Sequence, residues 1–247
     1  MKNIVLLGAT GSIGDSCLNV IRQNKKHFHL FGIGLGGNLD KAQQIAKEFS
    51  PKHIFVAESH IDKSHDLLKS YPNILNTEDE LQGLIQDPSV DIIISAISGF
   101  AGLKASYFAV DAGKTILIAN KESIVAAGDI LMPLAKTKNS EIIPVDSEHN
   151  ALYQCFPPHI DLKEISKIMI TASGGPFRKK TFKELSGVTL QDALKHPTWS
   201  MGTKITIDSA TLVNKCLELI EAHYLFQIPE SKIEIVVHPQ SIIHSMV

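Results

Sequence analysis

Acidic residues follow directly after an apolar run near the middle of the chain. In IPVDSEHNAL, residues 143–152, the residues Asp146, Glu148 and His149 come after the strand-like EIIPV. If the strand continues through them, both carboxylates point to one face, because side chains alternate along a strand. Two carboxylates this close repel each other unless a positive charge holds them. The fragment predicts either a divalent cation site or, taken alone, a solvated turn that exposes Glu148 and His149.

A second set of polar residues lies on a helix predicted over residues 208–226. Asn214, Glu218 and Glu221 fall at positions i, i+4 and i+7, so they share one face of that helix, and Lys215 lies beside it. The simplest interpretation is a solvated helix face with a Lys–Glu pair. The alternative is that this face presents side chains to a ligand.

Glu218 is the candidate for a third carboxylate beside Asp146 and Glu148. Three carboxylates without cysteine suit a hard cation, Mg²⁺ or Mn²⁺, rather than structural zinc. Ser209 lies near the start of the predicted helix, where a phosphate group is favoured. The second half of the chain therefore has residues for a metal and a phosphorylated ligand.

A glycine-rich turn follows the first predicted strand. The stretch LLGATGSIGDS places Gly8, Gly11 and Gly14 in a G-x-x-G-x-x-G spacing, a variant of the dinucleotide fingerprint. Glycines let the backbone approach a pyrophosphate, and the following helix offers free N–H groups. Further donors of this turn would come from Thr10, Ser12 and Ile13. The alternative is a glycine-rich turn with no ligand.

The end of the second strand bears on the choice of nucleotide. In GIGLGGNLDK, residues 32–41, the first acidic residue is Asp40, which lies past a predicted helix cap at Asn38. An acid in the turn itself would repel a 2′-phosphate, so its absence favours NADP over NAD. No Arg or Lys stands directly in this turn.

Two further segments of the second half are candidates for ligand contact. TASGGPF, residues 171–177, places Ser173 and a glycine pair after a strand, as in an anion-binding turn. KHPTWSMG, residues 195–202, puts Trp199 in a polar loop, which is typical of a lid. The alternative for Trp199 is packing on the core.

The elements that position these residues alternate along the first part of the chain. Strands are predicted at NIVLLG, HLFGIG, HIFVA, VDIIISA, TILIA and EIIPV, and helices at NLDKAQQIAKEF, SHIDKSHDLLKSY and TEDELQGLIQ. Apolar strands that alternate with helices predict an α/β fold with a parallel sheet covered on both faces. We predict a nucleotide-binding domain over residues 1–147 and a second α/β or α+β domain over 148–247, with strands at ISKIMITASGG, KIEIVVH and SIIHSMV. Because the chain stops within an apparent strand, we expect the second domain to be incomplete.

Composition limits the classes of function. The chain has 247 residues, 44% of them hydrophobic and 20% charged, with a net charge of −2. The chain lacks the excess of basic residues that would predict binding to nucleic acid or to a membrane surface. The three cysteines match no metal or redox spacing, and reduced thiols suit the cytoplasm.

Seven ordered motifs resemble one family along the whole chain. They are GATGSIG, ANKES, PVDSEHNA, SGGPF, HPTWSMG, DSATLVNK with the LE and IEA that follow, and HPQSIIHSMV. These motifs resemble the 1-deoxy-D-xylulose 5-phosphate reductoisomerases, the NADPH-dependent enzymes of the non-mevalonate isoprenoid pathway. The family has a Rossmann-like domain and a catalytic domain.

The resemblance implies a role for each motif. The divalent metal, Mg²⁺ or Mn²⁺ and also Co²⁺, would be held by Asp146, Glu148 and Glu218. The substrate would be held by Ser147, Ser173, Ser209, Asn214 and Lys215. The catalytic set and the closing loop would comprise Lys121, Glu148, His149, His196, Trp199, Met201 and His244. The dinucleotide would contact Gly8, Thr10, Gly11, Ser12, Ile13, Gly14, Gly36, Gly37, Asn38, Asn120 and Glu122.

The implied reaction has two stages. A metal-assisted rearrangement of 1-deoxy-D-xylulose 5-phosphate precedes reduction by NADPH to 2-C-methyl-D-erythritol 4-phosphate. The full-length form is expected to be a homodimer. Two departures stand out: Gly37 occupies a turn position that is commonly basic in relatives, and the family continues past HSMV into a helical domain, so we hypothesise that this chain is truncated.

Two rival hypotheses remain open. One is a different NADP-dependent oxidoreductase, of the semialdehyde or homoserine dehydrogenase kind, which needs no carboxylate triad. The other is an inactive nucleotide-binding fragment. Metal-dependent turnover and metal-dependent binding of substrate would argue against both rival hypotheses.

Overall fold

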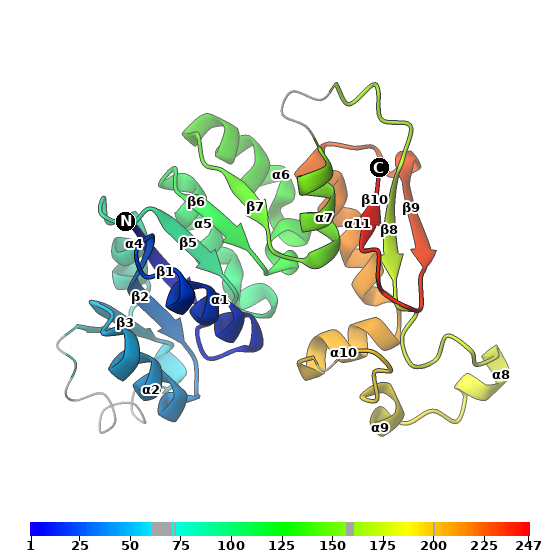
Figure 1. The fold of residues 1–247 in the computed structure, drawn as a ribbon, viewed down its shortest axis with the longest axis horizontal. Coiled ribbons are helices and arrows are strands. Elements are labelled where there is room, and N and C mark those ends of the chain that lie inside the picture. The colour runs from blue at the N-terminus through cyan, green and yellow to red at the C-terminus, as the bar shows by residue number, and fades with distance from the viewer. Residues whose placement is uncertain (61–70, 72, 157–160, 200) are drawn as a thin grey trace. The chain divides into compact units, whose positions relative to one another are not determined.

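The chain forms two compact units. The computed structural model describes residues 1–60, 71, 73–156, 161–199 and 201–247 (Figure 1). The units are Met1–Ile143 and Pro144–Val247, whereas the sequence placed the boundary between residues 147 and 148. Asp146 and Glu148 therefore belong to the same unit. Most of the predicted helix SHIDKSHDLLKSY lies outside the described residues.

The first unit is built on a seven-stranded sheet with the order β4-β3-β2-β1-β5-β6-β7. Its strands are β1 (Lys2–Leu7), β2 (Phe28–Leu35), β3 (His53–Val56), β4 (Ile74–Leu75), β5 (Ile92–Ser95), β6 (Thr115–Ile118) and β7 (Ile142–Pro144). The pairings from β4 to β6 are parallel, so the predicted parallel sheet is confirmed. The two-residue β4 was not predicted, because it is too short to show a periodic pattern. The strand order reverses at β1, where parallel α/β sheets bind ligands.

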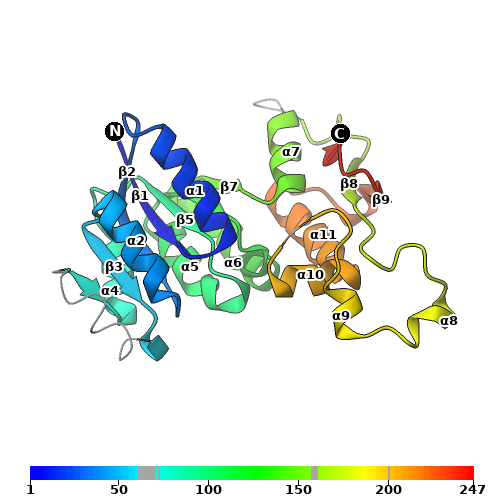
Figure 2. The same ribbon diagram turned by 60° about the horizontal axis from the view of Figure 1, so that its bottom comes forward.

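Helices cover both faces of this sheet. They are α1 (Ser12–Gln23), α2 (Leu39–Phe49), α4 (Glu78–Gln86), α5 (Leu103–Asp111) and α6 (Lys121–Lys138). Figures 1 and 2 show α1 and α2 on one face, and α4, α5 and α6 on the other. The central strands are apolar on both faces, and Leu6, Ile33 and Ile93 are fully buried. Burial on both sides explains why these strands read as continuous apolar runs.

The second unit contains a three-stranded sheet with the order β10-β8-β9. Its strands are β8 (Ile168–Ala172), β9 (Ile233–Val237) and β10 (Ser245–Met246), and its helices are α7 (Ser147–Cys155), α8 (Phe182–Leu185), α9 (Leu190–Ala193), α10 (Thr203–Ala210) and α11 (Val213–Phe226). Leu152 of α7, Ile170 of β8 and Phe226 of α11 share one buried core. Because both helices pack on this core, the polar side chains at their other ends are held in fixed positions.

The single helix predicted over residues 208–226 is two helices. The chain breaks between α10 and α11 at Leu212, whose φ of 61° is left-handed. This conformation costs a non-glycine residue about 1–2 kcal/mol, and the apolar pattern does not reveal it. Ser209 consequently lies in the last turn of α10, so its predicted place near a helix N-terminus is wrong.

In the part of the chain that the structure describes, no helix is both long and apolar enough to cross a bilayer.

Candidate metal and substrate site

Asp146 is the N-cap of α7. Strand β7 ends at Pro144, and the Asp146 carboxylate accepts the backbone N–H of Glu148 over 3.3 Å. The strand therefore does not continue through Glu148, and the condition under which strand alternation would align the two carboxylates is not met. The carboxylates still come together, because a capping side chain folds back over the first helical turn.

The buried face of α11 lies against this turn. Asn214, Lys215, Glu218 and Glu221 are all buried, and Glu218 and Glu221 are only 1% exposed. The predicted common face of this helix is confirmed, and its interpretation as a solvated face is wrong. Charged side chains are rarely buried so deeply unless opposite charges or a ligand compensate them.

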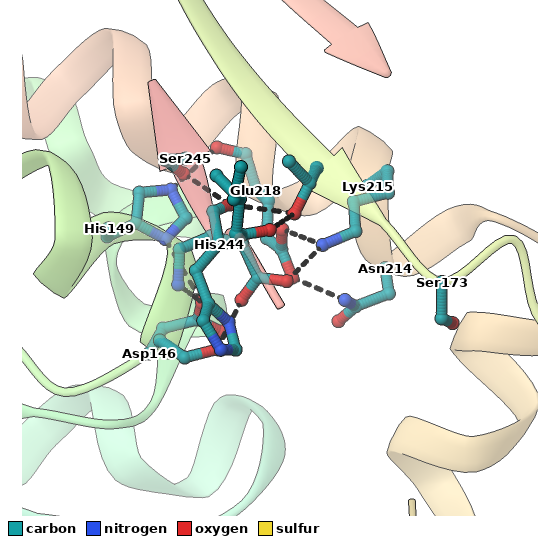
Figure 3. Close-up of polar contacts among 12 residues, drawn as sticks. Asp146, His149, Ser173, Asn214, Lys215, Glu218, His244 and Ser245 are labelled. Carbon is teal, nitrogen blue, oxygen red and sulfur yellow. Dashed lines mark hydrogen bonds and ion pairs between the residues drawn. The ribbon is translucent and has the colours of Figure 1, made fainter. Parts of the chain in front are cut away.

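Carboxylates from the two helices converge at one point. Asp146, Glu148 and Glu218 each offer an oxygen atom, and these atoms lie within 4.8 Å of one another. Mg²⁺ binds oxygen ligands at about 2.0–2.1 Å, so neighbouring ligands of one ion stand about 3–4 Å apart. The oxygen-only donor set and its spacing fit a hard divalent cation. Figure 3 shows Asp146 entering this cluster from α7, and Lys215 and Asn214 reaching Glu218 from α11.

The Lys215 ammonium compensates the negative charge of the cluster. Its Nζ donates to Glu148 over 2.7 Å and to Glu218 over 2.6 Å, and Asn214 also donates to Glu218. Burial alone would lower the pKa of Lys215, but Glu218 and Glu148 outweigh it and the pKa is raised. Burial, together with Glu218 and Asp146, raises the pKa of Glu148. The ammonium thus supplies positive charge between two carboxylates of the cluster.

His149 is fully buried and does not lie at the surface, so the interpretation of this segment as a solvated turn is wrong. Its Nδ1 lies 3.4 Å from an oxygen of Asp146 and 3.4 Å from an oxygen of Glu221, and its Nε2 lies 2.9 Å from the Glu218 carbonyl oxygen. Burial opposes the charged ring, but Glu221 and Asp146 prevail and raise the pKa of His149 to about 9. The ring therefore faces its carboxylates as a donor.

Removal of the Lys215 charge should destabilise the metal-free chain. We expect Lys215→Met to lower the free energy of unfolding in EDTA by roughly 3 kcal/mol, because it leaves buried carboxylates uncompensated. Added Mn²⁺ should restore much of that loss. Thermal melts with and without metal measure both effects. Lys204→Met, which breaks the exposed pair with Asp208 (Nζ to Oδ2, 2.6 Å), is the control and should cost less than about 1 kcal/mol. Equal losses in the two variants would contradict the expectation.

A second group of candidates surrounds the turn after β8. Ser173 Oγ lies 3.0 Å from His196 Nε2, and His196 Nδ1 accepts the backbone N–H groups of Thr198 and Trp199. Burial and then Arg178 lower the pKa of His196, so the neutral ring donates from Nε2 to Ser173. The sequence offered no signal for this contact, which joins the SGGPF and HPTWSMG motifs.

The loop after α9 carries Trp199 and Met201, two of the remaining predicted residues. Trp199 is 46% exposed and its ring centroid lies 6.4 Å from that of His244, so Trp199 does not pack in the core. The Met201 carbonyl lies 3.4 Å from the Thr206 hydroxyl. Ser200, which separates Trp199 from Met201, lies outside the described residues. Ser147 donates to Glu148 over 2.7 Å. The proposed roles of Trp199 and Met201 in ligand binding stay predictions.

In the first unit, the glycine-rich turn connects β1 to α1. Gly8 has a φ of +86°, and a Cβ at this position would lie 2.3 Å from the Ala96 carbonyl oxygen. A Cβ at Gly14 would lie 2.3 Å from the Ala9 carbonyl oxygen. Only glycine permits this packing of strand end, turn and helix. The N-cap of α1 is Gly11, and no side chain among the described residues caps this helix, which leaves its first N–H groups without the side-chain partner that would compete with a phosphate.

Neighbouring elements complete this turn. Lys41 donates to the Thr10 carbonyl over 3.1 Å and to Asp15 over 2.6 Å, bringing a positive charge to the turn that the sequence did not indicate. Asn120 caps α6 and donates to the carbonyl groups of Ile97 and Gly99 after β5. The other predicted cofactor residues of this unit lie in the turns that follow β1, β2 and β6 or in the first turn of the next helix: Thr10, Gly11, Ser12, Ile13, Gly36, Gly37, Asn38 and Glu122. Lys121, the first residue of α6, is 6% exposed.

Comparison with known families identifies the chain. A profile of the 1-deoxy-D-xylulose 5-phosphate reductoisomerase family matches residues 4–128, and a profile of its C-terminal domain matches residues 142–226. The chain belongs to the 1-deoxy-D-xylulose 5-phosphate reductoisomerase family. The resemblance read from the motifs is confirmed.

Individual members of the reductoisomerase family are similar to nearly the whole of this chain. The protein of Francisella tularensis subsp. novicida is 48% identical over 246 residues, and that of Geobacillus sp. is 46% identical over 250. The chain spans 64% and 65% of their lengths, respectively.

Solved reductoisomerases have the same fold. A crystal structure of DOX-P reductoisomerase in complex with NADPH, fosmidomycin and magnesium superposes with a TM-score of 0.94 at 41% identity, over 99% of this chain and 63% of the other. The Zymomonas mobilis enzyme in complex with NADPH gives 0.90 at 42% identity, over 100% of this chain and 64% of the other. An archaeal homoserine dehydrogenase gives 0.58 at 17% identity, which shows a common fold alone.

Proposed function

We propose that this chain has the activity of its family: NADPH- and divalent-metal-dependent isomerisation and reduction of 1-deoxy-D-xylulose 5-phosphate to 2-C-methyl-D-erythritol 4-phosphate. The observation that carries the proposal is the convergence of the Asp146, Glu148 and Glu218 oxygens within 4.8 Å. A solved relative of the same fold contains magnesium and NADPH. NADP-dependent oxidoreductases of the semialdehyde or homoserine dehydrogenase kind need no such cluster.

Asp146, Glu148 and Glu218 would hold the cation, Mg²⁺ or Mn²⁺. When bound, the cation stabilises negative charge on carbonyl and hydroxyl oxygens, which a rearrangement of a hydroxyketone requires. Lys215 and Asn214 extend the donor set beside these carboxylates. They suit the oxygen atoms of a sugar phosphate.

Ser173 and His196 would serve the substrate from the turn after β8. Their contact, 3.0 Å between Oγ and Nε2, leaves the serine hydrogen free to donate, because the ring already donates to Oγ. The half-exposed Trp199 is available to cover a ligand and exclude water. Met201, His244, Ser147 and Ser209 are proposed from the resemblance.

The glycine-rich turn would hold NADPH, which supplies hydride when bound. Gly8 and Gly14 bring the backbone close, and Lys41 neutralises Asp15, which would otherwise repel phosphate. Under the same proposal, the protein is a cytoplasmic homodimer, and light scattering tests that assembly.

Sequential calorimetry with the 247-residue chain tests the proposal. NADPH should bind alone, and fosmidomycin, which a solved relative contains, should bind only after Mn²⁺ is added. NADPH oxidation with 1-deoxy-D-xylulose 5-phosphate and Mn²⁺, followed by absorbance, should stop on addition of EDTA.

Two results would contradict the proposal in different ways. NADPH binding without metal-dependent fosmidomycin binding would identify a nucleotide-binding module. Turnover that survives chelation would favour a metal-independent oxidoreductase.

A further inference from the structure

We propose that Glu221 is a positioning residue of the metal site, which acts through the His149 ring. The inference rests on the proposed function, because it assumes that Asp146 and Glu218 hold a cation. Glu221 lies one helical turn beyond Glu218 on the buried face of α11. It does not belong to the triad of Asp146, Glu148 and Glu218.

The His149 ring connects the two helices that carry the carboxylates. From α7 its Nδ1 contacts the Asp146 carboxylate at 3.4 Å, and its Nε2 donates to the Glu218 carbonyl of α11 at 2.9 Å. The ring therefore orients one proposed ligand through its side chain and the other through its backbone. Figure 3 shows His149 beside Glu218 and Asp146 at the margin of the cluster.

Burial separates His149 from the chemistry. The ring is 0% exposed and stacks on Phe226, with centroids 6.3 Å apart and planes 8° from parallel. A side chain enclosed in this way does not touch a substrate. We therefore assign His149 to positioning, in place of the catalytic role that the resemblance implied.

Glu221 sets the orientation of the ring. Its Oε2 lies 3.4 Å from Nδ1, the nitrogen atom that also faces Asp146. The hydrogen bond of Nδ1 goes to Asp146, and the Glu221 contact is an ion pair, so both carboxylates favour a charged ring whose Nδ1 edge faces them. Metal-ligating groups are commonly held by such outer contacts, and loss of one costs about 10–100-fold in metal affinity.

The test measures Mn²⁺ affinity by electron paramagnetic resonance in Glu221→Gln and His149→Asn. Glu221→Gln keeps the size of the side chain and an acceptor oxygen atom, but removes the charge. We expect each variant to weaken Mn²⁺ binding about tenfold. The double variant should be little weaker than the single ones, because both changes interrupt one path. The dissociation constant for NADPH, measured in the other unit, should stay unchanged.

The matched control is Glu230→Gln. Glu230 is exposed and lies 3.9 Å from His223, so it forms a His–Glu pair away from the carboxylate triad. Mn²⁺ affinity should not change in this variant. If Glu221→Gln does not fold, Glu221→Asp replaces it, because it keeps the charge and withdraws the carboxylate from the ring. That variant should also bind Mn²⁺ several-fold more weakly.

Three results would overturn the proposal: wild-type Mn²⁺ affinity in the Glu221 variants, additive losses in the double variant, or two Mn²⁺ ions bound by the wild-type chain. The last result would make Glu221 a ligand of a second ion with Asp146 and His149. Failure of the wild-type chain to bind any Mn²⁺ would instead contradict the proposed function, so the two failures are distinguishable.

Discussion

Asp146→Asn is expected to weaken Mn²⁺ binding by about a hundredfold or more, because it removes one of three converging negative charges. The fold should survive the change. Asn is as good an N-cap as Asp, so the hydrogen bond from the Glu148 backbone N–H is kept. Calorimetric titration with Mn²⁺ measures the loss, and turnover should fall with it.

The control for this variant is Asp161→Asn. Asp161 is an exposed turn residue whose carboxylate also accepts a backbone N–H, from Lys163 over 2.9 Å. Its substitution should change neither Mn²⁺ nor NADPH affinity. In Asp146→Asn, the affinity for NADPH should stay within about twofold of the wild type. A parallel loss of both affinities would mean that the substitution unfolds the chain, and unchanged Mn²⁺ binding would remove Asp146 from the metal site.

Gly8→Ala is expected to abolish NADPH binding and to destabilise the first unit by roughly 3 kcal/mol. The new Cβ would lie 2.3 Å from the Ala96 carbonyl oxygen at a left-handed φ of +86°, and the atom that it meets belongs to the backbone, not to the end of a flexible side chain. Fluorescence titration with NADPH and thermal melting measure the two effects.

Gly83→Ala is the matched control. A Cβ at Gly83 has open space, and the residue lies inside α4. This substitution should leave NADPH affinity unchanged and stabilise the chain by about 0.5–1 kcal/mol, since alanine favours a helix over glycine. A Gly8→Ala chain that melts and binds NADPH like the wild type would show that the close approach to Ala96 is not needed.

Local pattern was enough to predict the strands of the first unit, apart from the two-residue β4. Its strands, such as Lys2–Leu7 and Ile92–Ser95, are continuous apolar runs, because both faces of the sheet are covered. The glycines at 8 and 14 were also informative, since only glycine fits where a Cβ would meet backbone. Both signals are read within a few residues of one another.

Errors arose where one residue changes the course of the chain. A periodic pattern continues across Leu212, although this residue takes a left-handed conformation and divides the predicted helix in two. The strand pattern likewise gave no sign that Asp146 caps a helix in place of continuing β7. Both features are set by backbone geometry at a single position, to which hydrophobic periodicity is insensitive.

The amino-acid sequence by itself determined the fold class, the family and the residue types of the site, because these follow from local periodicity and ordered motifs. Only the tertiary structure decided which charges meet. Lys215 bridges Glu148 and Glu218, and His149 joins α7 to α11, because Leu152 and Phe226 pack both helices on one core. Such contacts join residues about seventy positions apart, and their strength depends on burial, which exists only once the chain has folded.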